Sequence, residues 1–392
     1  MHIVLVAVSS ARQPSGVCRH AANLARCLLT RPEASRVTLV VGRWQVKYFQ
    51  EAFDLRAEKL NIIFVDIANS PISRNVWCWS RLPRLIRGLA PELVHLCFPM
   101  PVRRRAFSCP VVMTLHDLYP YDVPGNFGYP QVFFNRLFLR KCLHVADAIT
   151  CVSETTLLRL REHASAAVYG KALVLHNCVE AVPSQARKKP LKQIGNRPFF
   201  LCVAQHRINK NIPLLLRAFR TLLWLEEIDP QTMLVLVGNQ GPETSEIMRL
   251  IEKYFLEDNI AILQGIQDTE LHWLYANALL VVAPSTVEGF GLPVAEALLC
   301  GGRVVCSDIA AHREIGGSAC HYFTLHRQPE ESLLLAIRNA LLEPARKAEW
   351  MDRFSRKEIA AQCVSLYSHL LQIHFANNQQ RSTTLAQPAG HL

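Results

Sequence analysis

Residues 279–302 read LLVVAPSTVEGFGLPVAEALLCGG, and this stretch decides the fold. It opens with an apolar run that has the length of a buried strand. A glycine-rich turn follows, and Pro293 suits the first turn of a helix, where its missing N–H costs nothing. Gly301 and Gly302 then end that helix. We interpret the stretch as one strand–turn–helix unit of a parallel sheet covered by helices.

The same alternation extends through both halves of the chain. Residues 17–29 are a helix candidate between the strand-like runs HIVLVAV and RVTLVV. A polar, basic and proline-bearing segment, residues 181–198, separates the halves and reads as a linker. We therefore predict an α/β chain with two doubly wound, Rossmann-like domains, residues 1–180 and 199–360, that face each other across a central cleft.

The C-terminal part of the chain is predicted to be a helix followed by a tail. Residues 345–371 show helical spacing of apolar residues, and we expect residues 361–375 to return to the first domain. Residues 376–392 are polar, and we predict that they form a disordered tail.

Composition favours anionic partners. The 392-residue chain carries 43 Lys and Arg against 32 Asp and Glu, a formal net charge of +11. Such a surplus suits nucleotide diphosphates or acidic lipid headgroups, whereas no recognition motif for nucleic acid accompanies the charge. The thirteen cysteines form no CxxC pair. An odd number without a disulfide framework predicts free, buried thiols in a reducing cytoplasm.

The N-terminal residues, MHIVLVAVSS, resemble a signal peptide only superficially. They lack a basic region, so we interpret them as a buried first strand. No run reaches the roughly 18 apolar residues that a membrane span needs. We expect a cytoplasmic protein whose membrane contact, where it exists, is peripheral and at the inner face of the cytoplasmic membrane.

Two carboxylates flank the glycine turn. Gly289 and Gly291 let the backbone approach a ligand closely, and the helix start that follows can hold phosphate. Glu288 and Glu296 would repel an anion, but an ionised carboxylate accepts hydrogen bonds from sugar hydroxyls. A diphosphate between two sugars satisfies both features, and the turn therefore predicts a nucleotide-sugar site.

The sequence EGFGLPVAEA resembles the glutamate-x7-glutamate signature of the family 4 retaining glycosyltransferases, which have the GT-B fold. The resemblance covers most of the chain and is weakest over residues 40–90. Further matches follow in the order that this family uses: ADAITCVSETT (146–156), LHNCVE (175–180), VAQHRINKNIPLLLRAF (203–219), LVLVGNQGPE (234–243), LQGIQDTELHWLYANA (263–278) and REIGGSACHYF (313–323).

The resemblance assigns roles around the turn. Glu296 would bind the ribose hydroxyls and Glu288 the transferred sugar. The backbone amides of Phe290, Gly291 and Leu292 would face the diphosphate or the sugar. The chain has no Asp-x-Asp motif, so we expect a metal-independent reaction without a cofactor.

The resemblance also predicts a cationic side of the cleft. Arg207 and Lys210 would lie against the diphosphate, where fixed cations stabilise the departing charge. The arginine that the family often has five residues before the lysine is Gln205 here, so Arg207 would supply its charge from a shifted position. Asn239, in the loop after LVLVG, would lie near the base or the ribose.

Residues of the first half would complete the site. Gly16 would let the first helix approach the donor phosphate, although Ser15 replaces the other glycine that the family usually has there. His116 would lie near the anomeric centre. Its imidazole either accepts the acceptor's proton, binds the C6 hydroxyl of the sugar, or only orients the loop. Together with Lys210 and Glu288, it completes the predicted catalytic set. Glu314 matches a family glutamate, and we predict a packing or loop-organising role.

The acceptor is less specified. Residues 74–87, RNVWCWSRLPRLIR, interleave Trp77, Trp79 and Leu85 with four arginines. Either this segment contacts an anionic membrane, or it is an amphipathic helix on the first sheet with its charges in water. The first interpretation suits a lipid-linked acceptor such as a polyprenyl-diphosphate saccharide.

The sequence thus predicts a retaining hexosyltransferase of polysaccharide biosynthesis, with mannose from GDP-mannose as the expected donor sugar. Two alternatives stay open. A nucleotide-sugar 2-epimerase shares the two-domain layout, and a non-catalytic nucleotide-sugar-binding protein would share the site.

Overall fold

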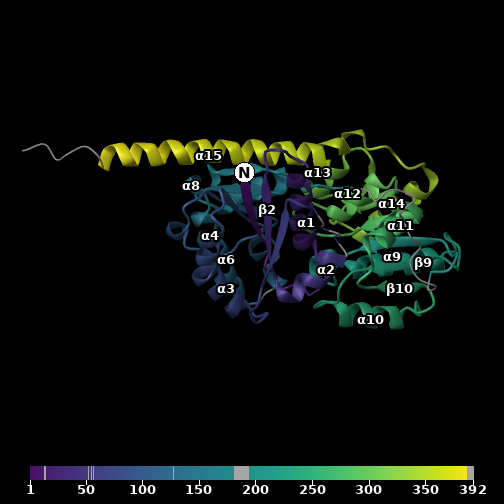
Figure 1. Cartoon of the computed structure of the whole chain (residues 1–392). Helices are drawn as coiled ribbons and strands as arrows, with labels where there is room; N and C mark the ends of the chain where they lie inside the picture. The colour runs from purple at the N-terminus through teal and green to yellow at the C-terminus, as the bar shows by residue number, and fades with distance from the viewer. Residues whose placement is uncertain are drawn as a thin grey trace, which may run out of the picture.

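A computed structural model describes residues 1–12, 15–51, 53, 55, 57–126, 128–180 and 194–385. These residues form two parallel sheets, each covered by helices on both faces (Figure 1). The predicted α/β architecture with two Rossmann-like domains is confirmed. Most of the predicted linker, residues 181–193, lies outside the described residues.

The first sheet has seven strands in the order β3-β2-β1-β4-β5-β6-β7, and all neighbouring strands are parallel. The strand order reverses between β1 and β4, where an open α/β sheet places its ligands. The strands are β1 His2–Val6, β2 Arg36–Gly42, β3 Leu60–Val65, β4 Leu93–Leu96, β5 Val111–Leu115, β6 Ala148–Cys151 and β7 Ala172–Val174. The helices are α1 Gly16–Leu29, α2 Val46–Glu51, α3 Pro71–Ser80, α4 Leu82–Leu89, α5 Tyr119–Asp122, α6 Gln131–Val145, α7 Glu154–His163 and α8 Ala166–Tyr169.

The second sheet has six parallel strands in the order β10-β9-β8-β11-β12-β13, with its reversal between β8 and β11. The strands are β8 Phe199–Val203, β9 Met233–Val237, β10 Ile260–Leu263, β11 Leu280–Ala283, β12 Val304–Ser307 and β13 Cys320–Phe323. The helices are α9 Ile212–Trp224, α10 Thr244–Lys253, α11 Asp268–Asn277, α12 Leu292–Leu299, α13 Ala310–Gly316 and α14 Pro329–Leu342.

Both sheets are buried on both faces, which explains why their strands read as continuous apolar runs. The N-terminal run that resembles a signal peptide is β1, an interior strand of the first sheet, and Ile3, Val4 and Leu5 are fully buried. All thirteen cysteines are free thiols, and twelve of them are buried. The structure therefore uses cysteine as a small core residue.

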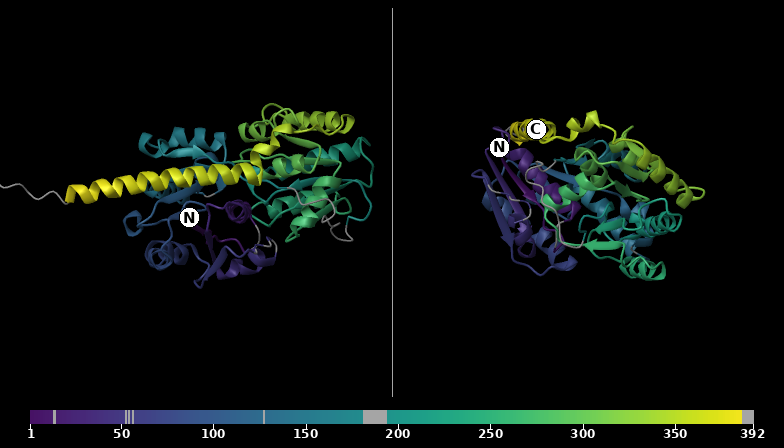
Figure 2. Two further views of the ribbon diagram at one scale, coloured as in Figure 1. Left: turned by 45° about the horizontal axis from the view of Figure 1, so that its top comes forward. Right: turned by 90° about the vertical axis from the view of Figure 1, so that its right-hand side faces the viewer.

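The C-terminal helix, α15 Arg356–Leu385, returns to the first domain and lies along it in the views of Figure 2. Ile359, Ala360, Cys363 and Tyr367 enter the core of that domain. Before α15 the chain forms a 3₁₀ helix, Glu349–Phe354.

The helix prediction for the C-terminal part needs two corrections. The helix begins at Arg356 and not at residue 345, and it continues through Leu385 into the predicted disordered tail. Residues 376–385 contain no glycine or proline, so nothing in their sequence stops a helix that the preceding turns have already nucleated. Residues 386–392 of the predicted tail lie outside the described residues. No helix of the described chain is both long and apolar enough to cross a bilayer.

The chain crosses between the domains twice, and the two crossings touch. The Val179 amide donates to the Phe354 carbonyl at 2.9 Å. Beside this contact, Glu180 forms an ion pair with Arg356 at the start of α15. A hydrogen bond and an ion pair thus connect the end of the first domain to the start of the return helix.

Candidate active site

Two helices from different domains begin opposite each other near the reversal points of the two sheets. A Cβ placed on Gly16, the first residue of α1, would lie 3.8 Å from Leu292 Cδ1, in the first residue of α12. The start of each helix carries unpaired N–H groups and a partial positive charge. The structure therefore brings Gly16 and Leu292 together, as a site for a diphosphate between the domains requires.

Gly289, in the turn before α12, lies against the first domain. A Cβ on Gly289 would come within 1.7 Å of the His116 carbonyl oxygen. The Gly289 carbonyl accepts hydrogen bonds from the hydroxyls of Ser153 and Thr156. The missing side chain thus lets the backbone of the first domain approach closely, and the approach of a ligand to Gly289 stays a prediction.

The next two residues of the turn differ in what they offer a ligand. Phe290 is 4% exposed, and its ring packs edge-to-face on Phe354 at 5.4 Å. Gly291 has φ = +98° and caps α12, a conformation that glycine adopts without strain. With the Phe290 side chain in the core, only its backbone can contact a ligand, and the role of the amides of Phe290, Gly291 and Leu292 stays a prediction.

Lys210 and Glu288 form an ion pair on the second domain. Lys210 Nζ lies 2.6 Å from Glu288 Oε1, and the Ser285 hydroxyl donates to the same oxygen at 2.7 Å. Burial alone would raise the pKa of Glu288, but attraction to Lys210 and His312 and these two hydrogen bonds lower it. The carboxylate is therefore ionised, and Oε2 is left to accept a hydrogen bond from a ligand hydroxyl.

Glu296 lies on α12, about one turn after its first residue, Leu292, and is 6% exposed. Its Oε2 accepts a hydrogen bond from the Tyr275 hydroxyl at 2.9 Å. Its Oε1 lies 3.7 Å from Nε of Arg19, which belongs to the first domain. Burial raises the pKa of Glu296, and Arg19 and Tyr275 oppose that rise. Glu296, the residue predicted to bind the ribose, therefore contacts side chains of both domains.

His116 follows β5 at the edge of the cleft. Its Nε2 lies 2.8 Å from the Cys97 carbonyl oxygen, so the ring proton sits on Nε2 and Nδ1 is an acceptor. Burial lowers the pKa of His116 to about 4, although the bond to Cys97 opposes this. The imidazole is neutral near pH 7.

The loop after His116 faces the cationic turn of the second domain. Burial raises the pKa of Asp117 to about 6, against the attraction of Arg207 and Lys210. The Tyr119 hydroxyl accepts a hydrogen bond from the Asn209 side chain at 3.2 Å. Arg207 is exposed. The structure thus brings the predicted diphosphate cations to the side of the cleft that carries His116.

Asn239 is engaged through its backbone. Its carbonyl accepts a hydrogen bond from the His206 amide at 3.1 Å, which joins the loop after β9 to the loop after β8. A Cβ on Gly241 would lie 2.4 Å from the His206 carbonyl oxygen. The loop is therefore tightly packed, and the contact of Asn239 with a base or ribose stays a prediction.

Comparison with protein families agrees with this arrangement. A model described as Glycosyltransferase Family 4 matches residues 14–181, and one described as Glycosyl transferases group 1 matches residues 184–358. The chain belongs to the family 4 glycosyltransferases.

Two curated proteins of Escherichia coli are similar to this family 4 member. The O-antigen chain mannosyltransferase B is 30% identical over 213 residues, which are 53% of this chain and 55% of the relative. The serotype-specific mannosyltransferase WbdA is 30% identical over 265 residues, which are 62% of this chain and 32% of the relative. The chain thus spans between a third and about half of the length of these relatives.

Among solved structures, sucrose-phosphate synthase from Thermosynechococcus elongatus is similar to the family 4 chain with a TM-score of 0.72. The match covers 95% of this chain and 100% of that structure at 20% sequence identity. This likeness concerns the fold, and it confirms the predicted GT-B architecture.

Three site residues of this family 4 member were missing from the sequence-based prediction. Arg19 Nη2 donates to Asp268 Oδ1 at 2.8 Å across the cleft, and Tyr275 holds Glu296 from α11. A signal for Arg19 exists, because it follows Gly16 by three residues and therefore lies on the same face of α1. No local pattern reveals its partners, which are about 250 and 280 residues away along the chain.

Glu314 organises a loop between the domains, as predicted. Its carboxylate accepts hydrogen bonds from the amides of Glu154 and Thr155 at 2.8 and 3.0 Å, at the start of α7. His176 Nε2 lies 3.0 Å from Glu314 Oε1. A carboxylate at a helix start satisfies unpaired amides and the helix dipole at once. This contact holds α13 of the second domain against the first.

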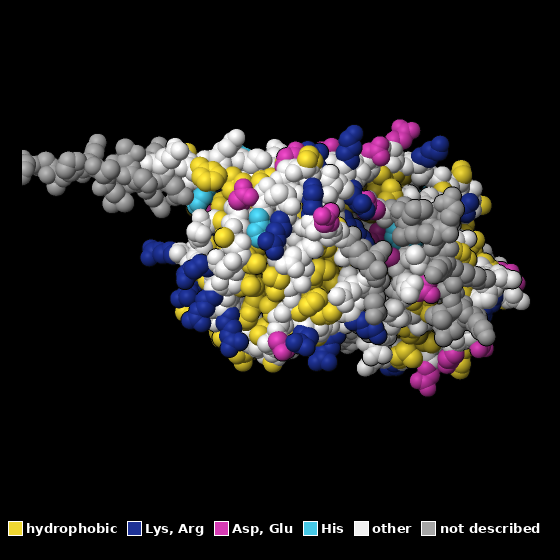
Figure 3. Space-filling model, in the orientation of Figure 1, with side chains coloured by type: hydrophobic (Ala, Val, Ile, Leu, Met, Phe, Trp, Pro, Cys, Tyr) yellow, Lys and Arg dark blue, Asp and Glu magenta, His cyan; other side chains and the backbone are white. Residues whose placement is uncertain are grey.

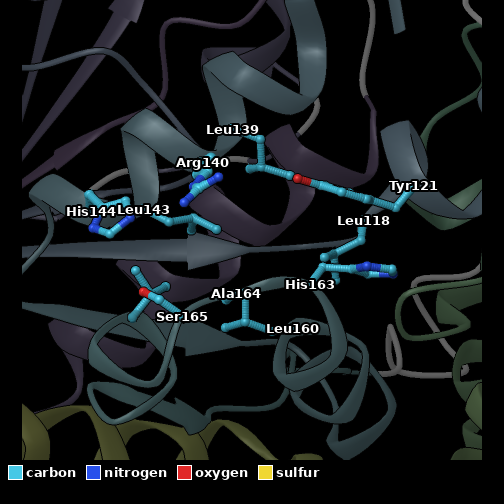
Figure 4. A pocket seen from close by; sticks show the side chains of 11 residues that line it. Leu118, Tyr121, Leu139, Arg140, Leu143, His144, Leu160, His163, Ala164 and Ser165 are labelled. Atoms are coloured by element: carbon cyan, nitrogen blue, oxygen red, sulfur yellow. The ribbon is translucent and has the colours of Figure 1, made fainter. Parts of the chain in front are cut away.

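A small, partly open pocket lies in the first domain. Its walls come from the segment after His116 and from α6, α7 and α8 (Figure 4). Tyr121 and His163 stack at its rim with ring centroids 4.4 Å apart. Leu118, Leu139 and Leu143 make much of the lining apolar. None of the predicted donor-binding residues lines it.

The basic segment at residues 74–87 forms two helices, α3 and α4, on the first sheet. Trp77 is buried and Leu85 is half-buried, so of the three apolar residues singled out in the sequence only Trp79 is exposed, at 52%. Lys and Arg side chains gather over this end of the first domain in Figure 3. The segment thus packs on the first sheet as the amphipathic-helix interpretation predicts. Contact of its exposed outer face with a membrane stays a prediction.

Proposed function

We propose that the chain transfers mannose from GDP-mannose to a growing, lipid-linked glycan, with retention of the anomeric configuration. The observation that carries the proposal is the placement of two carboxylates at the interdomain cleft: Glu288 in the turn before α12, and Glu296 one turn into that helix. The family assignment supports glycosyl transfer. The names of the similar mannosyltransferases support the choice of sugar.

The donor would lie with its diphosphate between the starts of α1 and α12. Lys210 is the cation closest to Glu288 and would balance the charge that develops on the departing diphosphate. In the reaction the bond between the sugar C1 and the diphosphate oxygen breaks. A bond forms between C1 and the acceptor oxygen on the same face, and the acceptor proton passes to the departing phosphate.

His116 would bind the sugar and not remove a proton. A general base works best when its pKa is near the working pH, whereas the pKa of His116 is lowered to about 4 by burial. Its Nδ1 is an acceptor because Nε2 donates to the Cys97 carbonyl. Of the alternatives left open by the sequence, a hydrogen bond from the C6 hydroxyl to Nδ1 fits these observations best.

The acceptor would approach over the first domain from an anionic membrane. Helices α3 and α6 contribute to one hydrophobic cluster on the same face of the first sheet. Each also exposes large apolar side chains: Ile72, Val76 and Trp79 on α3, and Phe133, Phe134 and Leu137 on α6. Exposed cations lie on α6, on the neighbouring helix α4 and in the segments after α3 and β4, namely Arg81, Arg84, Arg87, Arg103, Arg105, Arg140 and Lys141. Apolar side chains among cations suit the interface of an anionic bilayer.

The test is transfer of radiolabel by the full chain. GDP-mannose and two UDP-hexoses, each labelled in the sugar, are incubated with a bacterial membrane-lipid extract. We expect label from GDP-mannose in the lipid phase, and none with Lys210→Ala or Glu296→Ala. Turnover of a UDP-sugar without lipid extract would instead identify a 2-epimerase. Binding of all donors without transfer or turnover would identify a nucleotide-sugar-binding protein.

A further inference from the structure

Arg19 is a first-domain side chain that reaches the candidate donor site in the second domain. It lies in the first turn of α1, on the face that Gly16 turns toward α12. Its guanidinium meets Asp268, the first residue of α11, and Glu296 on α12. The side chains of Arg19, Asp268 and Glu296 are 17%, 18% and 8% exposed. One cation thus faces two carboxylates of the other domain in a site largely shielded from water.

The geometry leaves Glu296 able to bind a further ligand. Its oxygens together offer about four acceptor positions. Tyr275 uses one at Oε2, and Arg19 faces Oε1 without forming a short hydrogen bond. Two hydroxyls on neighbouring ribose carbons could therefore bind to the carboxylate while Arg19 stays in place.

The charges around Glu296 make Arg19 its essential partner. From α11, Asp268 repels the carboxylate and Tyr275 donates a hydrogen bond to it, while α1 supplies Arg19. Arg26, further along α1, is attracted to Asp268. A buried carboxylate that loses its cation tends to take up a proton. A protonated Glu296 would accept fewer hydrogen bonds from hydroxyls.

We propose that Arg19 is a positioning residue for the donor: it reaches across the cleft and holds Glu296 ionised and oriented for the ribose hydroxyls. This inference rests on the proposed function. An arginine suits the task because its planar fork contacts two carboxylates at once, whereas a lysine ammonium is a single point charge. The same contact ties nucleotide binding in the second domain to the position of α1.

The test is the affinity of the full chain for GDP, measured by titration calorimetry between pH 5 and pH 8. Arg19→Met keeps the aliphatic stem and removes the charge. We expect the midpoint of the acid-side loss of affinity to move upward by about one to three pH units. The dissociation constant at pH 6 should then rise at least about tenfold, with a smaller change at pH 8. Arg19→Lys should give an intermediate midpoint.

Two further variants make the result specific. Glu296→Gln should weaken binding at every pH and remove the acid-side midpoint, and adding Arg19→Met to it should change little. Arg104→Met breaks an Arg–Asp contact of similar length, 2.9 Å, within the first domain, and should bind GDP as the wild type does.

An unchanged midpoint in Arg19→Met would overturn the inference. So would an equal loss of affinity at all pH values together with a lower melting temperature, because that pattern belongs to a purely structural clamp. A wild-type chain that binds neither GDP nor UDP would overturn the proposed function instead, and the inference with it.

Discussion

The hydroxyl of Tyr367, on the return helix α15, lies 2.5 Å from Nδ1 of His95 on β4, and both side chains are fully buried. His95 Nε2 lies 2.7 Å from the Thr114 hydroxyl on β5, which also meets Thr150 on β6 at 3.0 Å. A continuous polar chain therefore runs from α15 across three strands of the first sheet. Each member satisfies a neighbour that has no access to water.

Removing the hydroxyl at residue 367 should loosen the return helix. Tyr367→Phe keeps the ring but leaves Nδ1 of His95 without its partner, which costs about 1–3 kcal/mol of unfolding free energy. Chemical denaturation followed by circular dichroism measures this cost. Tyr129→Phe, at a side chain that is 90% exposed, serves as the control and should unfold as the wild type does. Equal stability of the two variants would contradict the assigned role of the contact.

The buried histidines should make the fold sensitive to acid. Burial lowers the pKa of His95 to about 3 and that of His116 to about 4. In the unfolded chain both titrate near the ordinary value of about 6.5. Between these values the unfolded state binds more protons, so the free energy of unfolding falls as pH decreases from about 6.5 toward 4.

The variant His95→Gln tests this acid sensitivity. Glutamine does not titrate, so the variant should show a shallower decline of melting temperature between pH 6.5 and pH 4.5, even where it is less stable at pH 7. His326→Gln, at an exposed position of the second domain, should keep the wild-type slope. Parallel slopes in His95→Gln and the wild type would count against a neutral, buried His95.

The Lys210–Glu288 pair should matter for turnover more than for folding. Lys210→Met removes the charge that would face the departing diphosphate, and we expect kcat to fall at least about 100-fold. The melting temperature should also fall by a few degrees, because Glu288, whose side chain is only 10% exposed, loses its cation. Lys59→Met, at an exposed position on the first domain, is the matched control. Near-normal kcat in Lys210→Met would remove this residue from the catalytic set.

Much of the fold follows from local patterns, because both sheets are buried and their strands are apolar runs bounded by turns. The pattern of the glycine turn drew attention to Glu288 and Glu296, and the family resemblance drew attention to Lys210. Neither revealed that Lys210 pairs with Glu288, nor that Arg19 reaches Glu296, because such contacts depend on how distant loops meet. Local patterns also misplaced the start of α15, where a 3₁₀ turn and Ser355 separate two segments with similar apolar spacing.

Apolar side chains on α3 and α6 should govern membrane binding. Trp79→Ser and the double change Phe133→Ser with Phe134→Ser should each reduce co-sedimentation with phosphatidylglycerol vesicles severalfold. Binding of the wild type should weaken at high salt, since each nearby cation contributes about 1 kcal/mol at low ionic strength. Trp224→Ser and Phe255→Ser change side chains of the second domain that are 75% and 87% exposed, and should have no effect. Equal losses in both sets would contradict a specific docking face.

Gly289 should tolerate no side chain. A Cβ there would lie 1.7 Å from the His116 carbonyl oxygen, so Gly289→Ala must push the turn and the first domain apart, at a cost of about 1–3 kcal/mol. We expect a large loss of transfer activity in this variant. Gly88→Ala is the matched control: it lies in α4 with no atom within 4 Å of the new methyl group, and should be neutral or slightly stabilising. An active Gly289→Ala enzyme would show that this contact is dispensable.

The two interdomain connections meet at Val179 and Phe354, and this contact limits how the two domains can separate. Two connections that meet at one point behave as a single hinge, so a motion that keeps the Val179–Phe354 hydrogen bond is a swing about that point and not a sliding of one lobe past the other. Opening and closing of the two domains would then change the distance between α1 and α12, while the contact between Val179 and Phe354 stays in place.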